Sequence, residues 1–318
     1  MPNVFDRNAG FARGQAQVLG FSLATAIDEH SYSAPGSKIF YVDPNNAQAV
    51  DLGNLGEDPT VPLATVNAAV TLCRPYMGDT IYVAANEFWQ YASRAFRPLP
   101  IIETLVIPYT KGGIRIVGCG TNPLSVCWTP AAANQACITN YATDVLIEGF
   151  NFYPAAFAGC TGIASYWTGG GLLRYGENLT VRNCYFETTL DYGIACDYTW
   201  YCQFYDNYFD GVNIAAIFNI SNIGDIDFTT IHDNSFLNCT AAMTLTTSDG
   251  CFIYNNRIMG AHGGANNFID LTGGVGNLVS DNYFSCTIAE YDTTCTAGAG
   301  DYWLNNHCIN GSPIANPT

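Results

Sequence analysis

Five-residue segments of one kind recur through the second half of this chain and constrain its fold more than any other feature. The six copies are Glu148–Phe152, Arg182–Phe186, Tyr205–Phe209, His232–Phe236, Tyr254–Ile258 and Ser280–Phe284. Measured between their last residues, they follow one another at intervals of about 22–34 residues. A period of this length indicates stacked supersecondary units, each of which contacts mainly its neighbours.

Short apolar runs flank the copies, and their composition favours β-strands. One run precedes the segment, as in Leu179–Val181, and another follows it, as in Ala215–Phe218. β-branched and aromatic residues pack well on a pleated surface, and no run keeps a 3.6-residue period over helical length. We therefore predict an all-β chain, a single right-handed parallel β-helix. The chain lacks the regularly spaced leucines of a leucine-rich repeat, which excludes that fold. Its period is also shorter than the about 40 residues of a propeller blade.

The repeated segment also predicts how the turns of the solenoid stack. Its last residue should point inward onto its equivalents above and below. The Asn residues at its centre should hydrogen-bond along the axis and supply the left-handed backbone of a sharp corner. This column consists of Asn207, Asn234, Asn256 and Asn282.

Upstream of the repeats, the chain shows further strand patterns and one helix pattern. The apolar residues of Pro62–Cys73 follow i, i+3, i+4 spacing, which predicts a short amphipathic helix. Such a helix would cap the open end of the solenoid, where unpaired strand edges invite aggregation. The strands expected around it are Lys38–Val42, Asp79–Val83, Thr104–Ile107 and Ile114–Val117.

The first 36 residues are expected to form an arm ahead of a β-helix domain over residues 37–318. The apolar stretch Val18–Ala26 imitates a signal peptide, but it is short and broken by Gly20 and Ser22, so we expect no cleavage. An arm without a core of its own should bury its apolar residues on another subunit or an assembly partner. These attachment residues are Phe5, Phe11, Val18, Leu19, Phe21 and Leu23.

Composition excludes several classes of partner. Charged residues make up only 12% of the chain, and the formal net charge is −16. With Lys38 and Lys111 as its only lysines, the chain is not expected to bind nucleic acid, anionic lipid or acidic polysaccharide. The thirteen cysteines are odd in number and several stand within apolar runs, so we expect most to be reduced core residues. The cysteine and histidine spacings predict no metal site, and no cofactor is expected.

The acidic residues offer candidate catalytic groups if the chain is an enzyme. Asp206 and Asp233 precede the Asn column in neighbouring repeats, so they would lie about 5 Å apart, as glycoside hydrolysis or a hard cation requires. The alternative is that Asp and Asn simply suit a corner at this position. A second grouping joins Asp191, Asp197 and Asp210 to Arg182 and His232, with solvated coil positions as its alternative.

Aromatic residues cluster in the middle of the chain and suggest a binding surface. Exposed rings there would stack on sugars, or would pack at a subunit interface, where Tyr and Trp are enriched. The candidates for glycan binding are Tyr166, Trp167, Tyr198, Trp200 and Tyr201.

Residues 38–120 resemble the opening of pectate-lyase-like right-handed β-helix proteins, particularly those of tailed bacteriophages. The resemblance is carried by Lys38–Asp43, Pro62–Val70, Gly78–Val83 and Ile114–Gly120 and continues as a pattern to about residue 300. It implies a virion protein, often trimeric, that assembles in the host cytoplasm as a capsid decoration, head fibre or tailspike. Its partners would be copies of itself, other virion proteins such as the capsid, and a host surface glycan.

The active-site residues of the enzymatic members of that family have no matching positions in this sequence. We therefore expect a non-enzymatic structural protein, with a glycan-binding surface as an accompanying hypothesis. The alternative is a polysaccharide depolymerase, acting as a tailspike-type lyase or a glycoside hydrolase, and a cellular adhesin or filament subunit is a further possibility.

Overall fold

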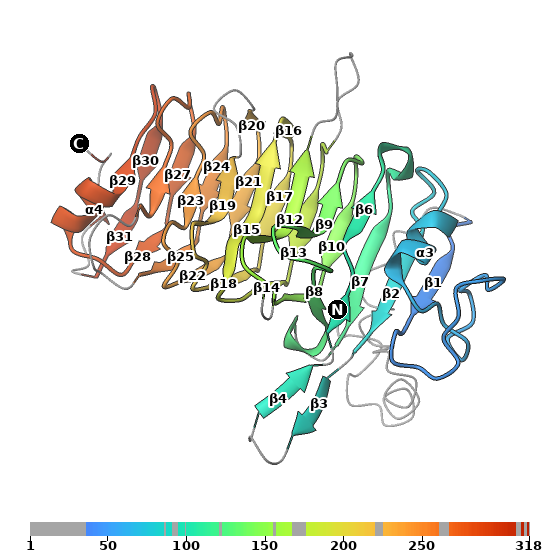
Figure 1. Ribbon diagram of the computed structural model, residues 1–318. Helices are drawn as coiled ribbons and strands as arrows, with labels where there is room; N and C mark the ends of the chain where they lie inside the picture. Colours follow the sequence, from blue (N-terminus) through green and yellow to red (C-terminus); the bar gives the residue numbers. More distant parts are fainter. Residues whose placement is uncertain are drawn as a thin grey trace, which may run out of the picture.

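The computed structural model describes residues 36–317 except 86, 91–94, 99, 121–122, 155–156, 167–175, 220–224, 261–266, 310–312 and 315–316; for 87–90, 95–98, 123 and 313–314 it describes the backbone alone. The chain winds into an elongated parallel β-helix, and its turns succeed one another from the N-terminal to the C-terminal end (Figure 1). The predicted arm lies outside the described residues, apart from Gly36.

The turns of the solenoid build three sheets of ten, ten and eight strands. The first sheet contains, in spatial order, β1 (Ile39–Val42), β2 (Thr80–Ala84), β7 (Arg115–Cys119), β10 (Leu146–Glu148), β13 (Thr180–Arg182), β17 (Gln203–Tyr205), β21 (Thr230–His232), β24 (Phe252–Tyr254), β27 (Leu278–Ser280) and β30 (Tyr302–Leu304). The second sheet contains β5 (Ile101–Ile102), β8 (Cys127–Thr129), β11 (Asn151–Phe152), β14 (Tyr185–Phe186), β18 (Tyr208–Asp210), β22 (Ser235–Leu237), β25 (Arg257–Met259), β28 (Tyr283–Phe284), β31 (Asn306–Cys308) and β32 (Pro313–Ile314). The third sheet contains β6 (Leu105–Ile107), β9 (Ala136–Asn140), β12 (Cys160–Tyr166), β15 (Leu190–Asp197), β19 (Ala215–Asn219), β23 (Met243–Thr244), β26 (Ile269–Asp270) and β29 (Cys295–Thr296).

Several smaller elements lie outside the three sheets. The pair β16 (Thr199–Trp200) and β20 (Ile226–Asp227) is parallel, whereas the hairpin of β3 (Glu87–Gln90) and β4 (Ala95–Pro98) is antiparallel and projects from the solenoid near its N-terminal end (Figure 1). Two short 3₁₀ turns, η1 (Tyr109–Lys111) and η2 (Pro123–Ser125), interrupt the connections. Neither α-helix in the described part of the chain is long and apolar enough to cross a membrane.

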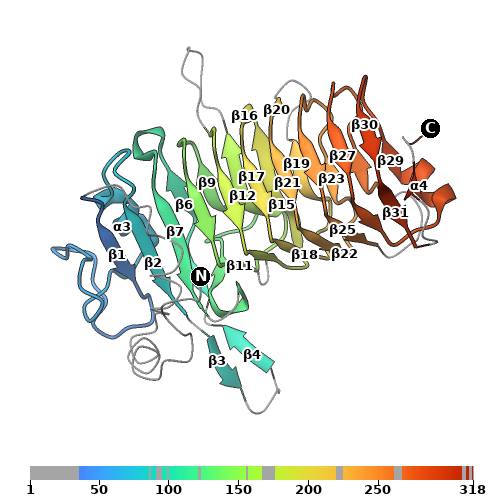
Figure 2. The ribbon, with the colours of Figure 1, turned by 180° about the vertical axis from the view of Figure 1, so that it is seen from behind.

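A short helix lies at each end of the solenoid (Figures 1 and 2). The helix α3 (Val66–Leu72) confirms the helix predicted over 62–73, and its buried residues pack on β1, β2 and β6 at the first turns. Near the C-terminal end lies α4 (Ile288–Thr294), which the sequence analysis missed. It begins with a capping box between Thr287 and Glu290 and buries Tyr291 against the last turns.

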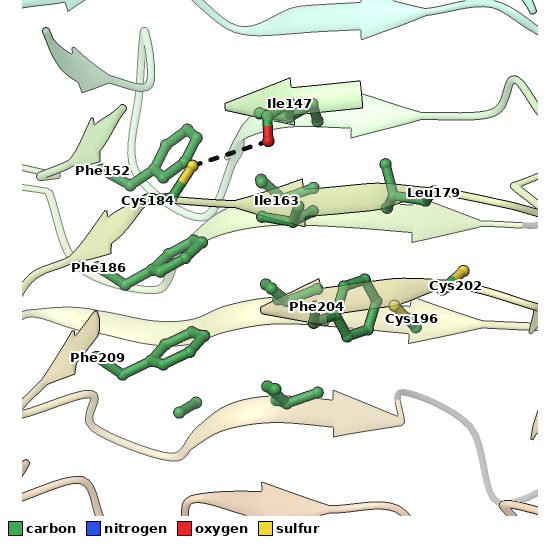
Figure 3. Packing of buried hydrophobic residues seen from close by; sticks show 14 of the residues in the cluster. Ile147, Phe152, Ile163, Leu179, Cys184, Phe186, Cys196, Cys202, Phe204 and Phe209 are labelled. Atoms are coloured by element: carbon green, nitrogen blue, oxygen red, sulfur yellow. Dashed lines mark hydrogen bonds between the residues drawn. The ribbon is translucent and has the colours of Figure 1, made fainter. Parts of the chain in front are cut away.

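The core is built from equivalent residues stacked turn upon turn, as the sequence predicted. Phe152, Phe186, Phe209 and Phe236 occupy one register of the second sheet, and successive rings are 4.6–5.0 Å apart between centroids. Figure 3 shows the first three of these rings lying one above another, with Cys184 next to Phe152 and with Cys196 and Cys202 across the interior near Phe204. All thirteen cysteines are buried, which confirms their expected place in the core.

The Asn column forms the axial hydrogen-bonded ladder that was predicted. Each side-chain amide donates to the amide oxygen of the next turn at 3.0 Å, from Asn207 through Asn234, Asn256 and Asn282 to Asn306. One part of the prediction was wrong, because the left-handed backbone belongs to the residue before the ladder. Asn183, Asp206, Asp233, Asn255 and Asp281 have φ values of 50–57°.

Candidate functional site

The aromatic residues singled out in the sequence meet where the third sheet leads into the first. Tyr198 follows β15, Trp200 lies in β16, and Tyr201 precedes the first-sheet strand β17. Tyr166 ends the neighbouring strand β12, whereas Trp167 lies outside the described residues. We call the surface formed by Trp200, Tyr201, Phe228, Asp225, Asp227 and Asp249 the acidic–aromatic corner.

Two exposed rings form a platform at this corner. Tyr201 and Phe228 stand on adjacent turns with their ring centroids 5.4 Å apart and their planes within 14° of parallel. Their side chains are 52% and 51% exposed, so neither ring is held by core packing. A solvent-exposed stacked pair offers a flat apolar face to a ligand.

The backbone of both platform residues is left-handed, which bulky side chains rarely adopt. Tyr201 has a φ of 58° and Phe228 a φ of 50°. The equivalent corner residues of neighbouring turns are Asn178, Gly250 and Gly276, residue types that tolerate this conformation. Such strain costs about 1–3 kcal/mol and is concentrated at functional sites, so the two rings mark this corner as a functional candidate.

Carboxylates from successive turns lie beside the platform. Asp227 Oδ1 accepts a hydrogen bond from the backbone N–H of Asp249 at 3.0 Å, and Asp249 Oδ1 accepts one from Val275 N–H at 2.9 Å. Trp200 and Asp227 are register partners in the β16–β20 pair, which places indole and carboxylate side by side. Acid groups and aromatic faces therefore occupy one short stretch of the solenoid surface.

Burial and neighbouring negative charges raise the pKa values of two of these acids. Burial, with added repulsion from Asp225 and Asp249, raises the pKa of Asp227 to about 6. Burial also raises the pKa of Asp225, and the charges of Asp249 and Asp197 act in the same direction. A carboxyl group that stays partly protonated near neutral pH can act as a general acid. Neighbouring strands are about 4.8 Å apart, close to the carboxyl separation of retaining glycosidases.

Of the three acids first considered as catalytic groups, Asp206 and Asp233 occupy the same corner position on adjacent turns, between the register pair Tyr205–His232 and the ladder pair Asn207–Asn234, whereas Asp191 lies on another sheet. Asp206 and Asp233 are exposed at the corner between the first and second sheets, both with a φ of 55°. Asp191 lies near the start of β15 in the third sheet, where it accepts a hydrogen bond from Asn213 at 3.4 Å. The left-handed backbone of Asp206 and Asp233 favours the alternative that Asp and Asn suit a corner.

The outer face of the first sheet carries an ordered polar column. Arg182 Nη2 lies 2.8 Å from Glu148 Oε2, and its Nη1 donates to Tyr205 Oη at 3.0 Å. The rings of Tyr205, His232 and Tyr254 stack in successive turns at 4.9 and 4.8 Å. Although burial opposes it, the charge of Glu148 helps to raise the pKa of Arg182, so this guanidinium is no candidate base. His232 Nδ1 contacts Asp233 Oδ2 at 2.6 Å.

A hollow of about 340 Å³ lies at the N-terminal end, beside the start of α3. Its acid, Glu103, accepts hydrogen bonds from the backbone N–H groups of Val66 and Asn67 at 3.0 and 2.7 Å. This carboxylate therefore caps the N-terminus of α3. Within the described residues, no group of three or more His, Cys, Asp or Glu side chains is arranged to hold a metal ion.

Sequence reasoning missed four residues of the acidic–aromatic corner: Phe228, Asp225, Asp227 and Asp249. A signal was present, because Phe228 follows Tyr201 at the same interval at which Phe236 follows Phe209. Aligning whole turns, instead of the five-residue segment alone, would have placed Phe228 on the platform.

Comparison with known proteins agrees with this architecture. Residues 111–258 match the family model described as "Right handed beta helix region". The fold is a right-handed parallel β-helix. No curated protein matches this chain in sequence.

Several solved β-helix structures resemble it at low identity. A crystal structure of Escherichia coli YbhC is 11% identical, covers 92% of this chain and 85% of its own, and superposes with a TM-score of 0.51. A rhamnogalacturonan lyase is 11% identical, with coverages of 87% and 75% and a TM-score of 0.43. The tailspike protein gp49 of Acinetobacter baumannii bacteriophage Fri1, described as a capsular polysaccharide depolymerase, is 12% identical, with coverages of 76% and 55% and a TM-score of 0.34. At these identities the likeness shows the fold alone.

Proposed function

We propose that this chain is a carbohydrate-binding β-helix and a non-enzymatic surface component of a bacteriophage particle. The observation that carries the binding role is the platform of Tyr201 and Phe228, two exposed, stacked rings at left-handed backbone positions. The virion role, with a homotrimer and a capsid contact through residues 1–36, is supported by the resemblance of residues 38–120 to phage β-helix proteins.

The charge around the platform selects the kind of glycan. Asp225, Asp227 and Asp249 lie beside the rings, and the chain carries a formal net charge of −16. Acidic sugars would be repelled at this surface, whereas neutral sugars and amino sugars would not. We therefore propose a neutral or amino-sugar polymer as the ligand.

Replacing Tyr201 by asparagine is expected to separate binding from stability. The change removes one ring of the platform but places at φ 58° a residue type that already occupies this position at Asn178. Affinity for a bound glycan should fall at least about tenfold, while the unfolding temperature should stay the same or rise because strain is relieved. Binding to a panel of neutral, amino-sugar and acidic polysaccharides, together with a thermal melt, measures both.

Tyr302→Asn provides the matched control, because Tyr302 is also an exposed tyrosine (65%, against 52% for Tyr201) and lies on β30, several turns away. It should bind like the wild type. Unchanged glycan binding in Tyr201→Asn would show that the platform does not contact the glycan.

A second candidate function, polysaccharide hydrolysis, is favoured by the titration of Asp227. Its pKa of about 6 and its two acidic neighbours resemble the paired-carboxyl arrangement of a general acid with a nucleophile or base. If this function holds, Asp227→Asn should lower the release of reducing sugars at least about 100-fold while leaving glycan binding intact.

The pH profile provides an additional check on that candidate. Because the acid must be protonated, cleavage by the wild type should decline as pH rises through about 6. Glycan binding without release of reducing sugars at any pH between 4 and 8 would exclude hydrolysis and leave the binding role.

A further inference from the structure

Two cysteines meet in the second sheet at the C-terminal end of the solenoid. Cys308 ends β31, and Cys286 lies two residues beyond β28. The strands β28 and β31 are paired, with Phe284 opposite Cys308 (Figure 1). Past the end of β28 the two backbones stay in contact, because Ile309 N–H donates to Cys286 O at 3.1 Å. Both cysteines are therefore held side by side on neighbouring turns.

The sulfur atoms of these two cysteines are in direct contact. Their Sγ atoms lie 3.6 Å apart, and each residue is 2% exposed. Cys251, on a middle turn, instead donates to the backbone carbonyl of Ile226 at 3.0 Å. Neighbouring strands lie about 4.8 Å apart, within the Cα separation of about 4.4–6.8 Å that a disulfide bridges. An S–S bond is about 2.05 Å long, so the sulfur atoms need to approach by only about 1.5 Å.

We propose that Cys286 and Cys308 are a redox-sensitive pair that forms a disulfide between the last two turns under oxidising conditions. The co-reactant is a small-molecule disulfide such as oxidised glutathione. One protein thiolate attacks this disulfide, which forms a mixed disulfide and releases one glutathione thiol. The other protein thiolate then attacks the protein sulfur of the mixed disulfide and releases the second glutathione thiol. The two cysteines are oxidised, the reagent is reduced to two thiols, and the two cysteine protons pass to these products.

In the closed structure this pair should react slowly. Burial raises the pKa of both thiols, and the negative charge of Glu290 acts in the same direction. Because the thiolate is the attacking species and a mixed disulfide needs space, the last turn has to open first. The last turn of a solenoid has a neighbouring turn on one side only, so it should open more readily than the middle turns.

Once formed, the disulfide would hold the C-terminal end of the solenoid closed. It would join residues that are 22 positions apart, and the segment between them contains α4, whose Tyr291 packs on Phe284 and Trp303. The cross-link restricts the opened chain, so the end would open freely in a reducing compartment and be locked in an oxidising one. This inference does not depend on glycan binding or on the virion role.

The experiment uses the full chain, purified with a reducing agent, separated from it and incubated with oxidised glutathione. Thiol titration in denaturant should show that two of the thirteen cysteine thiols are lost. Peptide mass spectrometry should find them in a Cys286–Cys308 cross-link. Urea below the unfolding transition should speed the reaction because it favours opening of the last turn. Hydrogen exchange in β28 and β31 should slow at least about tenfold in the oxidised protein.

Variants of single cysteines test the assignment. Cys286→Ala and Cys308→Ala should each prevent the loss of two thiols. Cys239→Ala is the matched control, because Cys239 is a buried cysteine just after β22 in the same sheet and its Sγ contacts Phe209 O at 3.7 Å. This variant should still lose two thiols. The cross-link map of the wild type needs no variant, so the proposal stays testable even if a substitution prevents folding.

Three results would overturn the proposal. The first is retention of all thirteen thiols both in buffer and in urea just below the unfolding transition, which would show that the two cysteines act only as core packing. The second is a stable glutathione adduct, or a cross-link to another cysteine such as Cys295, in place of the Cys286–Cys308 bond. The third is an unchanged loss of two thiols in Cys286→Ala or in Cys308→Ala.

Discussion

Replacing Asn256 by alanine is expected to cost about 3–5 kcal/mol of unfolding free energy, because two or more buried hydrogen-bonding groups lose their partners at about 1–3 kcal/mol each. Asn256 Oδ1 accepts from both the backbone N–H and the Nδ2 of Asn234, at 3.1 and 3.0 Å. Its own Nδ2 donates to Ile231 O at 2.9 Å and to Asn282 Oδ1 at 3.0 Å. Alanine breaks the ladder in its middle and leaves groups on both neighbouring turns unpaired.

Urea unfolding followed by circular dichroism measures the loss, and hydrogen exchange locates it. Because each turn of a solenoid contacts only its neighbours, exchange should accelerate in β22, β25 and β28 before distant turns. Asn255→Gly is the control: Asn255 is exposed with a φ of 53°, which glycine adopts freely, and the change should cost under about 1 kcal/mol. A similarly small cost for Asn256→Ala would show that water replaces the ladder.

The ladder also shows how far the sequence predicts the fold. The five-residue segment identified Asn207, Asn234, Asn256 and Asn282 because each precedes an inward Phe or Ile by two residues. It missed Asn306, whose segment ends in Cys308. Cysteine fills the same narrow interior at the last turn, so the period continues although the residue type changes.

The ends and the outer attachments of the solenoid were predicted less well than its interior. Both helices have seven residues, but α3 buries Val66, Ala69 and Val70 as an apolar stripe, whereas α4 buries only Tyr291. The hydrophobic period of α4 is therefore too weak to detect. Its capping box, Thr287 with Glu290, was the available signal. The hairpin β3–β4 lies outside the repeat and was not predicted.

The candidate site was predicted in part, for a physical reason. Tyr198, Trp200 and Tyr201 were noticed because aromatic residues are conspicuous in any sequence. Asp227 was not, because nothing local distinguishes it from Asp206: both follow the period of the repeat. The difference is burial, which depends on which side chains of the neighbouring turns cover each corner. That information is tertiary and cannot be read from spacing.

Replacing Phe209 by alanine is expected to destabilise the protein by about 3–5 kcal/mol through loss of buried ring surface and the cavity left behind. The ring is fully buried between Phe186, 4.6 Å away with planes within 8°, and Phe236, 4.9 Å away with planes within 3°. Gly193 fits directly against this ring: a Cβ added there would lie 2.7 Å from it. The space is therefore filled on three sides, and strands held by the first and third sheets cannot close onto the gap.

The matched variant Phe209→Leu keeps most of the volume and should cost only about 1–1.5 kcal/mol. Urea unfolding of both variants beside the wild type gives the two values. A much larger loss of unfolding free energy for Phe209→Ala than for Phe209→Leu would show that the rings stabilise the core by filling its volume. Equal costs in the two variants would contradict that role, because ring stacking adds only about 0.5–1.5 kcal/mol beyond burial. If alanine cost less than about 1 kcal/mol, the turns would have to collapse around the gap, and the stacked core would not hold the turns of the solenoid at a fixed spacing.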